Sequence, residues 1–380
     1  MPDFGAALSE HPDAVEAIGE VVGEVLEQVG EAPDLAVLFA TAPHGDAFAA
    51  MGATVLEAML PGTLVGASAV SVLGGGREVE EAPAVSLWAG RVGPVVPVQL
   101  EVLRTDEGIA VAGLPPEATD GPRTLLLLPD PFTFPADGFL EQAGRTNPDL
   151  QVVGGLASGA MTPGGNRLLL DGQVHTDGAV GVLFDSEAPV EAVVSQGCRP
   201  IGSPAVITRG EGNLVYELAG RPAMTRLQDL VTELDPDERA RGEHGLHVGI
   251  VIDERKSVFE RGDFLVRNLL GVDRQQGAVA IGDVADVGTT VQFHVRDAGS
   301  ADEDLRELMA PRRAEAALVF TCNGRGTHLF GQPDHDAQVV SEQLDGAPVA
   351  GMFCAGELGP VGGRNFLHGF TASVVLFGPT

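Results

Sequence analysis

The clearest periodic pattern near the start of the chain is that of an amphipathic helix. Valine and isoleucine recur at steps of three and four residues from Val15 to Val29, and glutamates fill positions between them. This spacing places one apolar stripe along a helix, which we predict over residues 13–29. Pro12 suits its first turn and Gly30 suits its end.

After this helix, a pattern of strand, helix and strand occurs three times. Each copy opens with a short apolar run, continues through a helix and returns as a second apolar strand. The opening strands are predicted at 35–40, 124–129 and 316–322, the helices at 47–60, 136–145 and 336–344, and the return strands at 64–70 (LVGASAV), 152–158 (VVGGLAS) and 349–355 (VAGMFCA). The return strands share an apolar pair followed by glycine and small residues. A fourth unit, over 246–297, is richer in strands and fits the pattern poorly.

The repeated pattern predicts the fold class. Repeated β-α-β-β units imply mixed sheets with helices packed on their faces, so we expect an α/β (α+β) protein of two domains. The stretch 195–204 (SQGCRPIGSP) breaks the hydrophobic periodicity with two glycines and two prolines. We therefore place the boundary near residue 190, with domains at 1–190 and 191–380.

Composition and charge narrow the classes of partner. With 380 residues, 44% of them hydrophobic, the chain can bury two cores. It carries 54 acidic against 23 basic residues, a net charge of −31, and so should repel nucleic acids and anionic membrane surfaces. No apolar run approaches the roughly 18 residues of a membrane span. The N-terminus carries acids where a signal peptide needs basic residues, so we expect a cytoplasmic protein.

Several catalytic signatures are absent from the sequence. There is no phosphate-binding GxxxxGK[ST] loop, no GxSxG nucleophile elbow, and no HExxH, CxxC or calcium loop. Asp334-His335-Asp336 is the nearest approach to a metal cluster, and we interpret it as a solvated helix start. Three scattered cysteines do not form a disulfide framework or a zinc clip. We expect no cofactor, no metal and no assigned catalytic residue.

One constellation near the C-terminus combines polar side chains with glycines. Cys322, Asn323, Arg325 and Gly326 follow a predicted buried strand, where ligands tend to bind in α/β sheets. The second part of the constellation is the glycine-rich stretch 354–373, with Cys354, Gly356, Glu357, Gly359, Arg364, Asn365 and His368. An arginine can hold a carboxylate and Glu357 an ammonium group, which together suit an amino acid or a similar zwitterion.

Three alternative interpretations stay open for these residues. Glu357 and Arg364 could pair with each other and only fasten a loop. Cys322, beside Arg325, could have a lowered thiol pKa and act as a nucleophile or redox switch, although a buried inert cysteine is the commoner case. His368 could act as a base, but its spacing assigns it no partner, and a hydrogen-bonding loop histidine is the simpler interpretation.

The chain resembles the FIST family of bacterial sensory proteins, which have an N-terminal and a C-terminal FIST domain. The resemblance rests on LAVLFATAPHG, VVGGLASG and RLLLDGQVHTDGAVGVLF in the first half, and on QGCRPIG, LVYELAGRPA, CNGRG and PVAGMFCAGELGPVGGRNFLHGFTAS in the second. It implies a sensor of small ligands, amino acids being the usual proposal. By position it carries over Cys322, Arg325, Gly326, Gly356, Glu357, Gly359, Pro360 and His368. The first-copy turn GASAV lacks the cysteine and threonine expected there.

Together these features predict a cytoplasmic sensor whose C-terminal half holds a small polar metabolite and which signals to an unidentified downstream protein. We expect Arg325 and Glu357 to make the charged contacts, with Asn323, Asn365 and His368 as hydrogen-bonding neighbours. The rival hypotheses are an enzyme with Cys322 or Cys354 as its nucleophile, and a protein-interaction scaffold that needs no ligand.

Overall fold

The chain divides into two compact units. The computed structural model describes residues 2–105, 108–115, 123–185, 188, 190–234 and 245–378. Unit 1 comprises Met1–Ser195 and Leu305–Thr380, and unit 2 comprises Gln196–Asp304. The border expected near residue 190 lies close to the point where the chain leaves unit 1. Residues 305–380, however, return to unit 1, so the compact units are not the two halves of the sequence.

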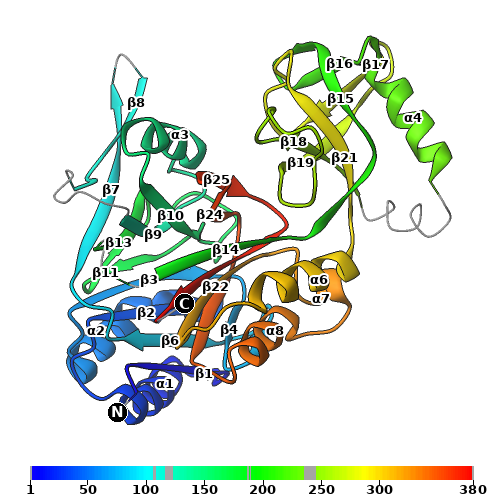
Figure 1. Ribbon diagram of the computed structural model, residues 1–380. Coiled ribbons are helices and arrows are strands. Elements are labelled where there is room, and N and C mark those ends of the chain that lie inside the picture. The colour runs from blue at the N-terminus through cyan, green and yellow to red at the C-terminus, as the bar shows by residue number, and fades with distance from the viewer. Residues whose placement is uncertain are drawn as a thin grey trace. The chain divides into compact units, whose positions relative to one another are not determined.

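Unit 1 contains three mixed sheets of one plan (Figure 1). In each, two parallel strands joined by a helix form the centre. The first sheet runs β1 (Phe4–Ser9), β6 (Val85–Gly90), β2 (Leu35–Thr41), β3 (Thr63–Ala69), β11 (Leu168–Leu170) and β12 (Gln173–His175). The second runs β25 (Arg364–His368), β24 (Glu357–Val361), β10 (Leu150–Gly155), β9 (Arg123–Pro129), β13 (Ala179–Phe184), β7 (Val95–Thr105) and β8 (Gly108–Ala112). The third runs β14 (Val190–Gln196), β26 (Thr371–Phe377), β22 (Ala316–Cys322), β23 (Val349–Cys354), β4 (Val72–Gly74) and β5 (Arg77–Val79).

The three copies exchange their hairpins in a cycle. The hairpin β4–β5 of the first copy joins the third sheet, β11–β12 of the second copy joins the first sheet, and β24–β25 of the third copy joins the second sheet. No sheet is complete without another copy. The strand ends also bond to each other: Ser158 Oγ donates to Phe353 O (2.6 Å) and accepts from Val70 N (3.0 Å), which links all three copies.

Alternating side chains of these strands fill two kinds of core. Leu126, Phe39 and Phe320 belong to one central cluster that all three sheets share, together with Trp88 and Phe377. The strand residues that alternate with these core residues point to the opposite face of each sheet, which helices cover. The covering helices are α1 (Ala14–Val29) and α2 (Phe48–Met59) on the first sheet, α3 (Ala136–Thr146) on the second, and α8 (His335–Gln343) with the end of α6 (Ala298–Met309) on the third. This confirms the predicted mixed sheets with helices on their faces.

The shared glycine of the three return strands has a steric cause. Each glycine pairs with a residue of the parallel opening strand. A Cβ on the glycine would overlap with the carbonyl oxygen of that residue. The distances would be 2.2 Å from Gly66 to Leu38 O, 2.2 Å from Gly154 to Leu127 O, and 2.0 Å from Gly351 to Val319 O. The similarity seen in the sequence therefore marks a close backbone approach in each copy.

Most predicted elements of unit 1 are confirmed to within a few residues. Asp13 caps α1, its Oδ1 accepting from Val15 N (2.9 Å) and Glu16 N (3.2 Å), so Pro12 lies just before the cap. A short 3-10 helix, Ala42–Ala47, precedes α2, and another short helix, α7 (Thr327–Phe330), precedes α8. The glycine-rich segment after Cys354 was treated as a loop. It forms the hairpin β24–β25, whose turn uses Gly362 and Gly363 at positive φ.

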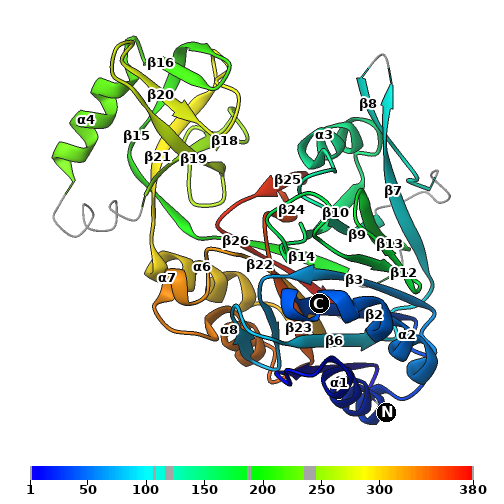
Figure 2. The ribbon, with the colours of Figure 1, turned by 180° about the vertical axis from the view of Figure 1, so that it is seen from behind.

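Unit 2 has a different plan from the three copies. Its strands run β15 (Cys198–Glu211), β21 (Thr290–Arg296), β18 (Leu246–Val251), β19 (Phe264–Asp273), β20 (Ala278–Ile281), β16 (Leu214–Leu218) and β17 (Arg221–Pro222). Every pairing between its described strands is antiparallel, and β15 also pairs with β16, which closes the sheet on itself. The helix α4 (Ala223–Glu233), which follows β17 in the chain, packs beside β16 (Figure 2). The poor fit of residues 246–297 to the repeat is thus explained.

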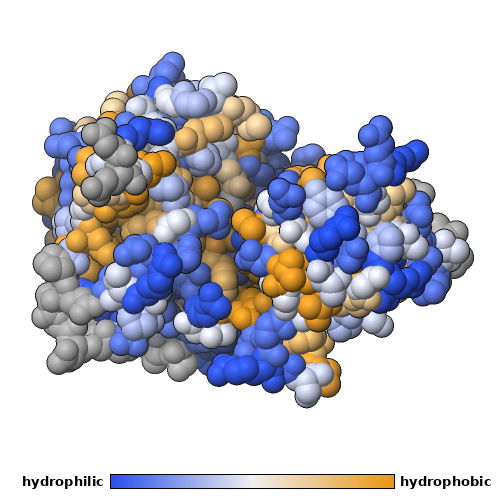
Figure 3. All heavy atoms as spheres, turned by 90° about the horizontal axis from the view of Figure 1, so that it is seen from above, coloured by the Kyte–Doolittle hydropathy of each residue, from blue (hydrophilic) through white to orange (hydrophobic). Residues whose placement is uncertain are grey.

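The chain passes from unit 1 to unit 2 between Ser195 and Gln196, inside the stretch 195–204 that breaks the hydrophobic periodicity. Most of that stretch lies in the long strand β15, in which Pro200 pairs with His294 and an irregularity between Ile201 and Ala205 accommodates Gly202, at φ 62°, and Pro204. On the face drawn in Figure 3, apolar residues lie in separate groups among hydrophilic ones. None of the helices in the described ranges is long and apolar enough to cross a membrane.

Candidate functional site

The predicted C-terminal residues lie where two parallel strands end side by side. Cys322 and Cys354 are the last residues of β22 and β23 and are direct partners in their register. Asn323 N donates to Cys354 O (3.0 Å), which ties the CNGRG turn to the neighbouring strand. The hairpin β24–β25 follows β23 and contributes Glu357. Sequence reasoning therefore grouped residues that the fold does bring together.

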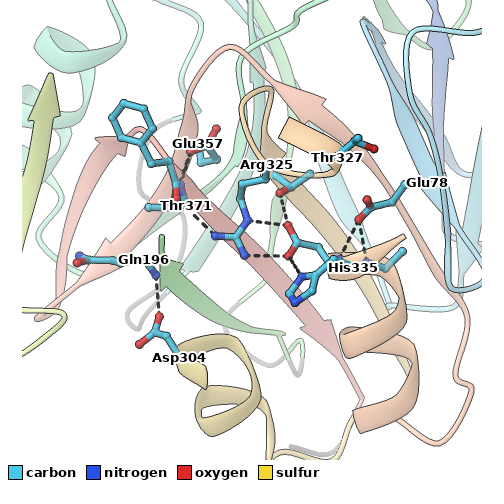
Figure 4. Close-up of polar contacts among 12 residues, drawn as sticks. Glu78, Gln196, Asp304, Arg325, Thr327, His335, Glu357 and Thr371 are labelled. Atoms are coloured by element: carbon cyan, nitrogen blue, oxygen red, sulfur yellow. Dashed lines mark hydrogen bonds and ion pairs between the residues drawn. The ribbon is translucent and has the colours of Figure 1, made fainter. Parts of the chain in front are cut away.

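Arg325 is the centre of a buried ion pair. Its side chain is 0% exposed, and its Nε and Nη2 donate to the two carboxylate oxygens of Asp336 at 2.7 and 2.8 Å (Figure 4). Thr321 Oγ1 donates to the same carboxylate at 2.5 Å. Burial alone would raise the pKa of Asp336, but the charge and hydrogen bonds of Arg325 outweigh it and hold that pKa well below its usual range. Asp336 was interpreted as part of a solvated helix start, and that interpretation was wrong.

An aromatic side chain and a histidine cover this ion pair. The ring of His335 stacks on that of Phe330 with centroids 3.4 Å apart, and His335 Nδ1 lies 2.9 Å from Asp336 Oδ1. The Arg325 guanidinium lies 5.3 Å from the Phe330 ring centroid. Arg325 is thus held on both its planar face and its donor edge, so its orientation is fixed.

A glutamate from the first copy completes the cluster. Glu78, on the hairpin β4–β5, accepts hydrogen bonds at Oε1 from Asp336 N (2.9 Å) and Ala337 N (3.1 Å), the first turn of α8. Its Oε2 is buried and receives no hydrogen bond from the described residues. Burial, and then the negative charge of Asp336, raise the pKa of Glu78 to about 8. Burial and the neighbouring carboxylate therefore favour the protonated form of Glu78.

Glu357, on the other side of Arg325, resembles Glu78 in being a buried acid with a raised pKa and one carboxyl oxygen without a donor among the described residues. It is wholly buried, and its Oε2 accepts from Thr371 N (3.2 Å) and Thr371 Oγ1 (2.8 Å). No described residue donates a hydrogen bond to its Oε1. Burial raises the pKa of Glu357 to about 8, although the bonds from Thr371, the charge of Arg325 and the Cys322 side chain act in the opposite direction. A buried acid with a raised pKa and one oxygen without a donor is suited to respond to a ligand.

The cysteines differ from one another in exposure. Cys322 is partly exposed, whereas Cys198 and Cys354 are buried. Burial raises the pKa of the Cys354 thiol well above its usual range, which disfavours the reactive thiolate. A Cβ on Gly155 would lie 2.3 Å from Cys354 Sγ, so the second glycine of VVGG makes room for this sulfur.

The glycines of the constellation lie against protein side chains. A Cβ on Gly326, which has φ 56°, would lie 2.7 Å from Glu80 Oε1, an oxygen that also accepts from Thr327. A Cβ on Gly356 would lie 2.8 Å from Leu367 Cδ1, and one on Gly359 2.3 Å from Val194 Cγ2. These glycines allow close packing of the hairpin β24–β25 and the CNGRG turn.

The remaining predicted residues are spread along the hairpin. Glu357 lies opposite His368 in the register, and Arg364 is exposed at the turn with its guanidinium 5.3 Å from the Phe366 ring, so Glu357 does not pair with Arg364. Asn365 binds β10, accepting from Val152 N and donating to Leu150 O. His368 Nε2 lies 3.0 Å from Gly359 O. Asn323 is partly exposed, and its Oδ1 has no hydrogen-bond partner in the described part of the chain.

Sequence reasoning missed Glu78 and Thr371 and misplaced Asp336. Asp336 carried a local signal, since it lies in the first turn of a predicted helix that follows CNGRG. Glu78 carried none, because it comes from a hairpin of the first copy. In the described ranges, no three His, Cys, Asp or Glu side chains are grouped to hold a metal ion.

Comparison with known proteins gives the family. Residues 34–221 match the FIST N domain and residues 223–360 match the FIST C domain. An uncharacterized protein of Mycobacterium bovis is 45% identical over 382 residues, which cover 98% of this chain and 98% of the relative. An uncharacterized protein of Mycobacterium tuberculosis is 43% identical over 381 residues, which cover 98% of this chain and 99% of the relative.

Proposed function

The chain belongs to the FIST family, whose domains are associated with sensory and signal-transduction roles, and we propose that it senses a small polar metabolite bearing an ammonium group, such as an amino acid. The observation that supports this is the Glu357 carboxyl, which is wholly buried, raised in pKa and without a donor at Oε1. An ammonium group would supply that donor and the charge that favours ionisation of Glu357.

In this proposal the partly exposed Cys322 and Asn323 form the entrance. Since Glu357 and Arg325 are wholly buried, a ligand reaches them only when the CNGRG turn or the hairpin β24–β25 moves. Arg325 acts as a positioning residue, because Asp336 occupies two of its donors. The movement of the turn is the event that a downstream signalling protein, in a cytoplasmic setting, would detect.

A thermal-unfolding screen against the twenty amino acids and small amines tests the proposal. A ligand at 100 times its Kd adds about 2.7 kcal/mol to the stability of the domain that binds it, a shift of roughly 5–10 °C. Binding of an ammonium group releases a proton from Glu357, so affinity should rise as the pH rises through about 8. The screen is therefore run at a pH below and a pH above that value.

The variant Glu357→Gln should lose the shift while keeping the bonds from Thr371. The matched control is Glu57→Gln, at an exposed position of α2, which should respond like the unmodified protein. A ligand that binds Glu357→Gln as well as the unmodified protein would exclude Glu357 as the sensing group. No shift with any compound, in a clean cooperative transition, would favour the ligand-free scaffold.

A further inference from the structure

Unit 2 contains a cavity of about 180 Å³ that the proposed sensor site does not include. It lies between the helix α4 and the strands β15, β16 and β21, and all its lining residues belong to unit 2. One side is apolar, with Leu218, Leu230 and Phe293. The other side carries the charged side chains of α4, among them Arg226 and Asp229. The cavity therefore has a polar and an apolar wall, as small-molecule sites do.

Arg226 is one of four charged side chains in this lining, with Arg221, Asp229 and Glu233. Its Nε is buried, and no described residue accepts a hydrogen bond from it or forms an ion pair with it. The neighbouring Arg221, in contrast, is paired with Asp229 at 2.7 Å. A guanidinium N–H removed from water without an acceptor lowers stability. Because this Nε is buried, a planar anion in the cavity restores the missing bond in bidentate geometry when the Arg226 side chain turns the N–H toward it.

The size and the apolar wall restrict what such an anion can be. Leu218, Val291 and Phe293 are 3%, 4% and 9% exposed and offer only carbon to the cavity. A dry cavity of about 150 Å³ accommodates a benzene ring. The occupant that fits is thus a compact molecule with one acidic end and a short apolar body.

A second cavity, between β8 and α3, differs from the first in charge, and this difference decides which of the two could bind an anion. It is larger, about 570 Å³, and residues such as Ile109, Phe139 and Gln142 line it. None of its described lining residues is charged. In a protein of net charge −31, an anion needs a local cation. In the cavity of unit 2, Arg221 is paired with Asp229, so Arg226 is the cation left for an anion among the described lining residues, while Glu233 of the same lining opposes anion binding.

We propose that the cavity beneath α4 binds a small monocarboxylate with an apolar body. The carboxylate lies against the guanidinium of Arg226, and the body packs on Leu218 and Phe293. This site is separate from Glu357, and its occupant has the opposite charge at its recognition group. It gives the protein a second input that does not depend on the first.

Isothermal titration of the full-length protein with benzoate and hexanoate tests the proposal, with benzamide and hexanamide as neutral partners of equal shape. Both carboxylates should bind and both amides should bind at least about tenfold more weakly, because a charge-assisted bond contributes about 1.5–3 kcal/mol. Arg226→Gln should weaken benzoate at least about tenfold. Arg274→Gln, an exposed arginine of unit 2 outside the cavity, should leave the affinity unchanged.

Arg226→Lys keeps the positive charge but loses the planar guanidinium that binds a carboxylate with two hydrogen bonds. This variant tests the role of Arg226 if Arg226→Gln does not fold. Its affinity for benzoate should fall by a smaller factor. Equal binding of benzoate and benzamide, no binding of either carboxylate, or undiminished binding by the arginine variants would overturn the proposal. Glu357→Gln should bind benzoate normally, so failure of the sensor site and failure of this site are distinguishable.

Discussion

Arg325 in unit 1 and Arg226 in unit 2 are surrounded in opposite ways. Arg325 is wholly buried, and Asp336, Phe330 and the backbone of Phe370 surround its guanidinium. Arg226 is half-buried beside a cavity, and its Nε has no partner among the described residues. Arg325 lies in a glycine-rich motif and attracts attention in the sequence, whereas Arg226 lies in an ordinary amphipathic helix.

In our proposals, this difference separates a positioning arginine from one that contacts a ligand. A guanidinium whose three nitrogens each have a partner in the protein is suited to orient its neighbours. An unpaired guanidinium beside a cavity gains bonds when an anion arrives. Burial and pairing therefore locate candidate contacts better than proximity to glycines does.

The strongest test of this comparison removes each charge in turn. Arg325→Leu should lower the free energy of unfolding of unit 1 by about 3–5 kcal/mol, because it leaves Asp336 buried without its cation. Arg226→Gln should change stability by no more than about 0.5–1 kcal/mol. Urea unfolding measures both, since the single tryptophan, Trp88, lies in the core of unit 1 and the single tyrosine, Tyr216, lies in unit 2.

Adding Asp336→Asn to Arg325→Leu provides the control. Removal of the stranded charge should recover part of the lost stability. Equal losses for the two single arginine variants would contradict the distinction between them. A double variant no more stable than Arg325→Leu would show that packing, and not charge, is what the arginine supplies.

A second test uses the glycines that the three copies share. In Gly351→Ala, the added Cβ would lie 2.0 Å from Val319 O, so the strands β22 and β23 must separate. We expect a loss of about 2–3 kcal/mol, seen by Trp88 fluorescence in urea. Gly19→Ala, in the exposed face of α1 with nothing within 4 Å of the new Cβ, should instead stabilise by about 0.5–1 kcal/mol. A neutral Gly351→Ala would mean that the close approach is not required.

The repeat was predictable from the sequence because each copy is local. An apolar strand, a helix and a return strand follow one another within a short stretch, and periodicity detects each of them. The exchange of hairpins was not predictable, since β4–β5 and β24–β25 join sheets of other copies. Short strands with glycine turns, such as Gly362-Gly363, look like loops when their partner strand is distant in the sequence.

The same limit applies to the site. Cys322, Arg325 and Glu357 were found because they lie near strand ends within one copy. The partners that determine their chemistry were missed, because Glu78 lies on a hairpin of the first copy and Thr371 follows the hairpin β24–β25. The cavity of unit 2 required the closed antiparallel sheet, for which the irregular β15 gave no periodic signal.

A third test concerns the pH dependence of unit 1. Glu78 and Glu357 have pKa values raised to about 8 from an ordinary 4.5, so the folded protein binds more protons than the unfolded chain between these values. The stability that they contribute is therefore full below pH 4.5 and falls as the pH rises to about 8. Both carboxyls act in the same direction, so the free energy of unfolding of unit 1 should fall throughout this pH range.

Urea unfolding followed through Trp88 at several pH values measures this slope. Glu78→Gln and Glu357→Gln should each flatten it and should be more stable than the unmodified protein at pH values above about 8. Glu57→Gln, at an exposed site, should retain the slope. A slope of the same size in the double glutamine variant would assign the pH dependence to other groups.

The smallest effect that we predict is in cysteine reactivity, and it decides between a sensor and an enzyme. Cys322 is partly exposed, so iodoacetamide at neutral pH should label it first, while Cys198 and Cys354 react at least about tenfold more slowly because they are buried. The rate at Cys322 should be that of an ordinary thiol, since the neighbouring cation Arg325 is already neutralised by Asp336. Labelling followed by peptide mass spectrometry measures the three rates. A Cys322 rate far above that of a free thiol, lost in Arg325→Leu under conditions where that variant remains folded, would favour the nucleophile hypothesis over the sensor, because a nearby positive charge stabilises the reactive thiolate.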